Sequence, residues 1–362
     1  MKGTVLKSRQ NYNAIDLTRF ICAILVIMLH VPPFGVTDSG TVYHYLNFGI
    51  RQYAARTAVP FFFIAAGFFL FRKTSPESFD TGIIKKYVIR VLRLYLIWTV
   101  IYLPISAYRI YESGQGILYS VARYLRDLVF AGSFTQLWYL KGLAVAVCIT
   151  AVLVQRGVRP VRILAAAFIL YMIGLFAQSW YGFIVPLRES APFVWKVLKL
   201  VRMVISTTRN GVFDGFLFVA IGMCFAYCDI SVSRRLSFIL FAVSMGLLFA
   251  EVFILESNHY VRAHDMYLFL VPVAFFMFCA VRQVELSDSG IFKVLRVMSS
   301  LMFYTHLWIS WVVTKAMKVA GVNTHDSCVR FLTVLVLTLA VSYLIYHLSG
   351  RDRFRWLKKL YT

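Results

Sequence analysis

Residues 13–33 read NAIDLTRFICAILVIMLHVPP, and the pattern of this segment recurs along the whole chain. Every residue between Arg19 and His30 is apolar. A helix needs roughly 20 apolar residues to cross the hydrocarbon core of a bilayer, so the segment predicts a transmembrane helix over residues 17–36. A long polar lead precedes it and no small-residue cleavage site follows, so we expect a retained helix, not a signal peptide.

Similar apolar runs fill most of the 362 residues, 60% of which are hydrophobic. Soluble domains contain about 45–50% apolar residues, so lipid is the solvent that suits this chain. The runs are continuous, which excludes the alternating pattern of a membrane β-barrel. We predict an all-α, polytopic membrane bundle of about ten transmembrane helices, forming a single domain over residues 1–362. The predicted helices are 17–36, 57–72, 87–108, 136–154, 162–180, 211–228, 236–255, 266–282, 297–317 and 329–348.

The net charge of +22 comes from basic residues that lie between the apolar runs. This distribution favours contact with a lipid bilayer, and no nucleic-acid recognition motif accompanies it, so we expect no nucleic-acid partner. Short cytoplasmic loops are enriched in Lys and Arg. The basic loops RGVRPVR (156–162) and SRRLS (233–237) therefore predict a multi-pass protein of the cell membrane, plasma or inner, with both termini in the cytoplasm.

Three features outside the predicted helices give further expectations. The segment GILYSVARYLRDLVFAG (116–132) is amphipathic and is expected to lie in the membrane interface. The six cysteines lie mostly in apolar runs without metal-type spacing, so we expect no disulfide framework and no metal site. One loop on the outer side contains His259, His264 and Asp265, for which a solvated loop is favoured over a metal site.

Arg19 and His30 are ionisable residues within the first predicted helix, and such residues are functional candidates. They are eleven positions apart, which in a helix amounts to three turns and about 20°. Both side chains should point the same way, about 16 Å apart along the axis. We expect them to line one cavity, with the cation at the cytoplasmic mouth. The alternative is that Arg19 extends to the interface and His30 is structural.

Arg90 and Arg93 lie on one face at the start of the third predicted helix, on the same cytoplasmic side as Arg19. Guanidinium groups bind phosphate through two parallel hydrogen bonds. The three arginines therefore suit a phosphorylated donor molecule. The alternative is that they only contribute to the positive charge of the cytoplasmic side.

Four further residues are candidates for the site. Glu251 lies within the seventh predicted helix, where it pairs with a buried base or accepts a proton from substrate; these two roles remain open. Asp214 begins the sixth predicted helix on the expected outer side, and His306 lies among aromatic residues of the ninth. We assign Asp214, His306 and the aromatic Trp138 to acceptor binding, with a structural role for His306 as the alternative.

Five motifs resemble the membrane acyltransferase 3 family. The segment 13–20 with Arg19 and His30 resembles its Arg-x10-His pattern, and Arg90-Val-Leu-Arg93 resembles its Arg-x-x-Arg motif. VPFFFIAAGFFL (59–70), LWYL (137–140) and FYTH (303–306) follow in the family's order, so the resemblance covers essentially the whole chain. Position 17 is Leu and position 18 is Thr where many members have Gly-Leu.

This resemblance implies transfer of an acyl group, commonly acetyl, from cytoplasmic acetyl-CoA to a hydroxyl of a cell-surface glycan. It makes His30 the catalytic histidine and gives Arg19, Arg90 and Arg93 the task of holding the donor. Acetyl-CoA is then a substrate, and no metal is implied. An imidazole takes the proton of an attacking hydroxyl or carries the acyl group itself, and the sequence leaves both roles open.

TTRNGVF (207–213), followed by Gly222-Met223, is similar to one branch, the membrane half of vancomycin-resistance-type serine racemases. We expect no racemase half within these residues. This resemblance supplies the alternative function, an uptake module for serine or another small amino acid. Nothing in the sequence defines the oligomeric state.

Overall fold

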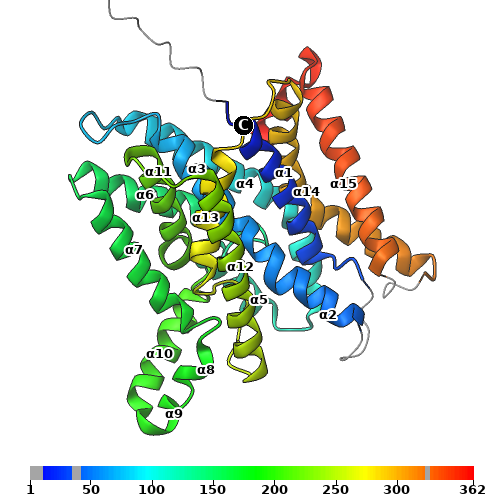
Figure 1. Ribbon diagram of the computed structural model, residues 1–362. Coiled ribbons are helices and arrows are strands. Elements are labelled where there is room, and N and C mark those ends of the chain that lie inside the picture. The colour runs from blue at the N-terminus through cyan, green and yellow to red at the C-terminus, as the bar shows by residue number, and fades with distance from the viewer. Residues whose placement is uncertain (1–10, 35–41, 323–326) are drawn as a thin grey trace, which may run out of the picture.

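The chain folds into a bundle of helices in which the start of the first helix lies at the same end as the C-terminus (Figure 1). The computed structural model describes residues 11–34, 42–322 and 327–362, and this part of the chain contains helices and no strand. The α-helices are α1 (Asn13–His30), α2 (Val42–Phe48), α3 (Ala58–Phe71), α4 (Thr81–Glu112), α5 (Ile117–Phe130), α6 (Trp138–Gln155), α7 (Pro160–Leu175), α8 (Tyr181–Ile184), α9 (Leu187–Ser190), α10 (Pro192–Ile205), α11 (Phe216–Tyr227), α12 (Arg234–Ser257), α13 (Leu270–Arg282), α14 (Ile291–Val319) and α15 (Ser327–Ser349). Four segments of other helical pitch are η1 (Gly49–Tyr53), η2 (Ala54–Thr57), η3 (Gly211–Gly215) and η4 (Asp352–Leu360).

The all-helical fold predicted from the sequence is confirmed for the described residues, and each of the ten predicted ranges overlaps a helix. The first range, 17–36, runs past the end of α1 at His30, and its residues 35–36 lie outside the described residues. Among the described residues, six helices are long and apolar enough to cross a membrane, and three shorter apolar helices accompany them. The six are Asn13–His30, His44–Phe71, Thr81–Glu112, Trp138–Gln155, Arg234–Ser257 and Cys328–Ser349. Ten crossings and cytoplasmic termini remain predictions.

The outer surface of the bundle is apolar. Phe249 and Phe253 of α12 are exposed by 55% and 62%, and Val336 and Leu344 of α15 by 60% and 54%. Large contiguous apolar surfaces are rare on soluble monomers. These helices therefore present the surface that lipid covers.

α3 and α11 pack at very short range in the centre of the bundle. A Cβ at Gly67 of α3 would lie 2.6 Å from the carbonyl oxygen of Val219, and a Cβ at Gly222 of α11 would overlap the carbonyl oxygen of Ile64. Small residues allow two membrane helices to approach this closely and to gain van der Waals contact. The glycine pair thus determines the separation of the two central helices.

An ion pair between the buried Asp16 and the half-exposed Arg296 joins the first helix to α14. Asp16 is 1% exposed and accepts hydrogen bonds from Arg296 Nε at 2.9 and 3.0 Å and from Nη2 at 2.5 Å. A bidentate pair of this kind fixes geometry as well as adding energy. Because Arg19 follows Asp16 by three residues, it lies on the same face of α1, toward α14.

The second predicted helix, 57–72, is part of a longer helical run over His44–Phe71. The run changes pitch before α3, first to a π-helical segment, η1, and then to a 3-10 segment, η2. Such changes of pitch reorient side chains and are frequent at functional sites. Here they place Arg51 and Arg56, one in each segment.

We expect Gly222→Ala to lower stability by about 1–3 kcal/mol, because the new methyl group must separate α3 from α11. The matched control is Gly246→Ala in α12, where no atom lies within 4 Å of the added Cβ. Thermal unfolding of the detergent-solubilised protein would measure both. Equal midpoints for the two variants would contradict the assigned packing.

Candidate active site

A basic cavity is lined by Arg19, near the start of α1, and by Tyr361, near the C-terminus, and we call it the basic chamber. Its volume is about 500 Å³, and it lies between α1, α3, α4, α6 and α14. Four cationic side chains line it, and no acidic side chain does: Arg19, Lys73, Lys86 and Arg90. Arg19 Nε is buried and has no hydrogen-bond partner among the described residues. Unpaired cations in a partly buried cavity favour an anionic ligand.

Arg90 and Arg93, the two residues of α4 that the sequence singled out, have different surroundings. Lys86 and Arg90 are four residues apart and line the basic chamber together, with the Arg90 guanidinium 5.0 Å from the centre of the Tyr87 ring. Arg93 does not line the chamber. Its Nη2 donates to the carbonyl oxygen of Thr362 at 3.0 Å, so it holds the C-terminal residue against α4.

A second cavity, the histidine chamber, lies deeper along α1 and contains His30. It has a volume of about 300 Å³ and is lined by His30, Arg51, Arg56, Gln136, Trp138, Arg209, Asp214, His264, Asp265 and Phe303, among others. His30 is the last residue of α1. The preceding carbonyl oxygen, on Leu29, accepts a hydrogen bond from Arg51 Nε at 3.1 Å. A cation at a helix C-terminus satisfies an orphan carbonyl and complements the helix dipole, which fixes this end of α1.

His306 of α14 is stacked on His30, with the two ring centres 5.4 Å apart. Its Nδ1 lies 3.0 Å from the carbonyl oxygen of Met302, which can only accept, so Nδ1 carries the proton. Its Nε2 is then a free acceptor, buried without a partner among the described residues. No described residue hydrogen-bonds to the His30 ring, so stacking orients His30 and leaves its nitrogen atoms available.

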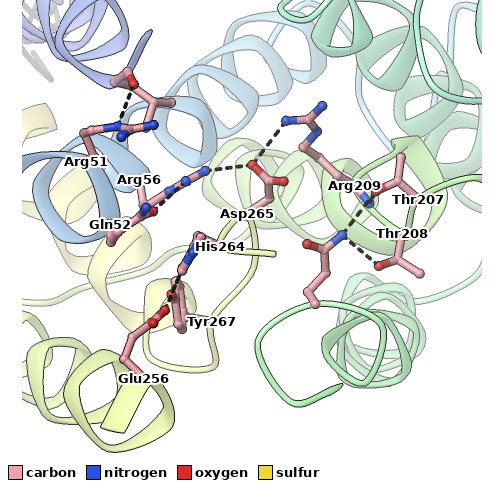
Figure 2. A network of polar contacts seen from close by, with 12 residues as sticks. Arg51, Gln52, Arg56, Thr207, Thr208, Arg209, Glu256, His264, Asp265 and Tyr267 are labelled. Carbon is pink, nitrogen blue, oxygen red and sulfur yellow. Dashed lines mark hydrogen bonds and ion pairs between the residues drawn. The ribbon is translucent and has the colours of Figure 1, made fainter. Parts of the chain in front are cut away.

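An acidic residue shared by two arginines lines the same chamber as His30. Figure 2 shows Asp265 between Arg56 and Arg209. Asp265 Oδ1 lies 2.7 Å from Arg56 Nη1 and 3.2 Å from Arg209 Nη1. Burial alone would raise the pKa of Asp265, but Arg209 and Arg56 outweigh burial and hold this pKa below its usual range. Asp265 is therefore an anion at neutral pH, and the trio carries a net positive charge.

A folded turn sets the position of Arg209. Thr207 Oγ1 accepts a hydrogen bond from the backbone N–H of Arg209, and Gln178 donates to Thr207 and Thr208 (Figure 2). The Asn210 side chain then caps η3, which carries Asp214 into the chamber. The guanidinium of Arg209 lies 5.1 Å from the centre of the Trp138 ring.

Glu251 lies outside both chambers. Its carboxylate accepts hydrogen bonds from the backbone N–H groups of Leu268 and Phe269, each at 2.8 Å, and from Trp180 Nε1 at 3.1 Å. Phe269 is the N-cap of α13 and Leu268 precedes it, so the carboxylate lies at the N-terminal end of the helix, where a negative charge complements the helix dipole. Glu251 therefore lines neither chamber, its carboxylate is occupied by these three contacts, and a catalytic role for it stays a prediction.

Arg19 and His30 do not share one cavity, contrary to our expectation. Arg19 lines the basic chamber and His30 lines the histidine chamber. The side chain of Phe303 lines both, so the two chambers meet there. The ~16 Å between positions 19 and 30 along α1 places each residue in a different chamber.

Several residues of these chambers were missed in the sequence. Asp265 and His264 were expected in a solvated loop, and this was wrong because the loop folds back onto Arg56 and Arg209. Arg56 and Lys73 gave no signal, since each lies next to an apolar run and looks like an interface residue. Arg209 is part of the TTRNGVF motif (207–213), so this motif could have marked it as a site residue.

The geometry is accompanied by clear similarity to known proteins. The family described as an acyltransferase domain matches residues 12–347. An amino-acid racemase of Enterococcus faecalis is 30% identical over 75% of this chain and 36% of its own length. A second one from that organism is 26% identical over 94% and 47%. A serine/alanine racemase of Enterococcus gallinarum is 30% identical over 73% and 36%. The chain thus spans between about a third and a half of these relatives, and no solved structure matches it.

We expect His264→Gln to flatten the pH dependence of stability between pH 6.5 and 4. Burial, with Arg56 nearby, lowers the pKa of His264 from 6.5 to about 4. Its Nδ1 lies 2.9 Å from both the Tyr267 hydroxyl and Glu256 Oε1. Between these values the unfolded chain takes up a proton that the folded protein does not. The wild-type protein therefore loses stability as the pH falls through this window, by at most about 3 kcal/mol.

Unfolding midpoints at a series of pH values would measure this effect. The control is His259→Gln in the same loop, outside the chamber. An unchanged slope in His264→Gln would contradict the burial of a neutral imidazole.

Proposed function

The chain belongs to the acyltransferase 3 family, and from this premise we propose that it moves an acyl group across the junction of the two chambers. The donor is an acyl-CoA, acetyl-CoA in the simplest case, bound in the basic chamber. The acceptor is a hydroxyl of a cell-surface carbohydrate or related molecule, bound in the histidine chamber. One observation carries the proposal: a cationic cavity and a histidine-containing cavity meet at one side chain, Phe303.

The residues of the basic chamber fit the donor. Arg19, Lys73, Lys86 and Arg90 match the negative charge of the CoA phosphates, and the unpartnered Nε of Arg19 offers a buried donor. Aromatic side chains, among them Phe62 and Tyr139, line the path toward Phe303. The long pantetheine arm of CoA suits the separation between the basic chamber and His30. The phosphates stay among the cations while the thioester extends past Phe303 to His30.

His30 is placed to manage the proton of the acceptor. In the simpler mechanism its ring nitrogen accepts the proton of the hydroxyl as the oxygen attacks the thioester carbonyl carbon. The carbon–sulfur bond then breaks, and the thiolate takes the proton from the imidazolium. In the second mechanism a His30 ring nitrogen attacks the thioester carbonyl carbon, and the CoA thiolate leaves. The acceptor hydroxyl then attacks the acyl-imidazole, which frees His30, and the proton of the hydroxyl goes to the thiolate. The stacked His306 keeps the ring oriented in both cases.

The histidine chamber offers charged and aromatic groups for the acceptor. Arg56 and Arg209 supply guanidinium groups, Asp214 supplies a carboxylate, and Trp138 supplies a flat apolar surface. Sugars present hydroxyls to polar groups and C–H faces to aromatic rings, so this mixture suits a carbohydrate. We place the protein in the plasma or inner membrane, with the basic chamber toward the cytoplasm as the distribution of Lys and Arg predicts.

A second candidate function is uptake of serine or another small amino acid. The names of the relatives favour it, since they are amino-acid and serine/alanine racemases. The Arg56, Asp265 and Arg209 cluster also offers charges of both signs to a zwitterion. Accumulation of labelled serine by vesicles containing the protein, without any acyl-CoA-dependent transfer, would favour uptake over acyl transfer.

We expect His30→Ala to abolish acyl transfer, by at least 100-fold in kcat, because the proton of the acceptor then has no base. The protein should still insert and fold. The control is His347→Ala in α15, which removes a histidine outside both chambers. Transfer of labelled acetyl by membranes containing each variant is the measurement. Wild-type rates in His30→Ala would remove this residue from the mechanism.

We expect Lys86→Gln and Arg90→Gln each to raise the KM for acyl-CoA about tenfold, the loss expected for one charge-assisted contact to phosphate. The matched control is Lys85→Gln, which makes the same change on the same helix outside the chamber. Arg93→Gln should raise KM less than Arg90→Gln, because Arg93 contacts the C-terminal residue instead. Equal KM values for Lys85→Gln and Lys86→Gln would contradict the donor site.

A further inference from the structure

A third cavity, which we call the α5 cavity, lies between α4 and α5 and adjoins the histidine chamber. It has a volume of about 420 Å³. Most of its lining consists of charged or hydrogen-bonding side chains, among them Arg109, Gln115, Ser120, Arg123 and Tyr124. The donor and the reacting hydroxyl do not need this space.

The helix α5 turns its polar face toward the cavity and its apolar face outward. Ser120, Arg123, Tyr124 and Asp127 recur at the spacing of one helix face and line the cavity. Leu118, on the other face, is 83% exposed. A helix in the membrane interface shows lipid its apolar side, so its polar side is here reserved for the interior of the protein.

Two hydroxyls in the α5 cavity lack partners. Ser120 is 7% exposed, and its Oγ is buried without a hydrogen-bond partner among the described residues. The hydroxyl of Tyr124 is also buried without a hydrogen-bond partner among the described residues. Buried hydroxyls are normally hydrogen-bonded, and leaving them unpaired is costly. These two groups therefore point to a ligand that supplies hydrogen-bonding atoms.

The charge of the α5 cavity specifies the ligand further. Arg109, Arg123 and Arg209 line it, and the one acidic lining residue, Asp127, is paired with Arg126 at 2.7 Å. The remaining positive charge favours an anion. An aromatic ring, Phe134, lies 4.6 Å from the Arg109 guanidinium and adds a flat surface.

The α5 cavity and the histidine chamber share two lining residues, Thr135 and Arg209. The two cavities therefore adjoin, and together they offer space for one elongated molecule between His30 and α5. We propose that the α5 cavity binds the distal units of an acidic oligosaccharide or polysaccharide whose reacting hydroxyl lies at His30. This proposal rests on the function proposed above and names the class of acceptor, a polyhydroxylated polyanion longer than one sugar.

Binding to the full-length protein in lipid nanodiscs tests the proposal without any acyl donor. The probes are a galacturonic acid tetramer, the galacturonic acid monomer and the neutral sugar maltotetraose. We expect the acidic tetramer to bind at least about tenfold more tightly than either of the others, because it alone can fill the histidine chamber and bring carboxylates to the arginines of the α5 cavity at the same time. The monomer is too short to do both, and maltotetraose has no carboxylate.

Two variants locate the effect. Arg123→Gln should raise the Kd of the tetramer about tenfold, toward that of the monomer. Tyr124→Phe should also raise the Kd of the tetramer. It should not lower thermal stability, because it removes a hydroxyl that has no partner among the described residues. The control is Lys199→Gln on the exposed face of α10, which makes the same charge change outside all three cavities.

The outcomes separate this inference from the proposed function. A tetramer that binds no better than the monomer, or an Arg123→Gln protein that binds like Lys199→Gln, overturns the α5 subsite. If acetyl transfer to a single sugar persists in that case, the proposed function stands. Tight and Arg123-dependent binding of the tetramer by a protein without transferase activity would support the subsite and sink the acyltransferase.

Discussion

The cost of holding charge inside an apolar bundle governs how this protein is built. A charge removed from water must find a partner of opposite sign or a water-filled cavity. Asp16 is paired with Arg296, and Asp265 is shared by Arg56 and Arg209. The cations of the basic chamber have no acid among the residues that line it with them. This division separates structural charges from the charges that suit an anionic ligand.

The two chambers give a physical reason for a long donor molecule. Arg19 and His30 project from one helix, yet three helical turns place them in different cavities that meet at Phe303. A compact donor held by its phosphates would not reach the imidazole. A donor with a flexible arm brings its reactive carbon to His30 while its charged end stays among the cations. In the proposed reaction the acceptor reaches His30 from the other side, where the histidine chamber and the α5 cavity adjoin.

Much of the fold was predictable, because continuous apolar runs specify helices and small residues permit close packing. The catalytic candidates on α1 and α4 were also visible, since ionisable residues are rare in such runs. The trio around Asp265 was not, because its members come from three separate parts of the chain and only the tertiary fold brings them together. The same holds for Glu251, whose capping of α13 depends on contacts beyond its own helix. Arg90 and Arg93 are three residues apart, so the sequence places both on one face of α4. It does not reveal that Arg93 is hydrogen-bonded to Thr362, a contact that only the tertiary fold creates.

The central claim is that donor and acceptor reach one histidine from opposite ends of the bundle. The most direct test reconstitutes the full-length protein in sealed vesicles that enclose an acidic oligosaccharide, with labelled acetyl-CoA added only outside. The account predicts labelled ester on the enclosed sugar, formed by the molecules whose basic chamber faces outward. Label found only on sugar that shares the compartment of the acetyl-CoA would contradict it.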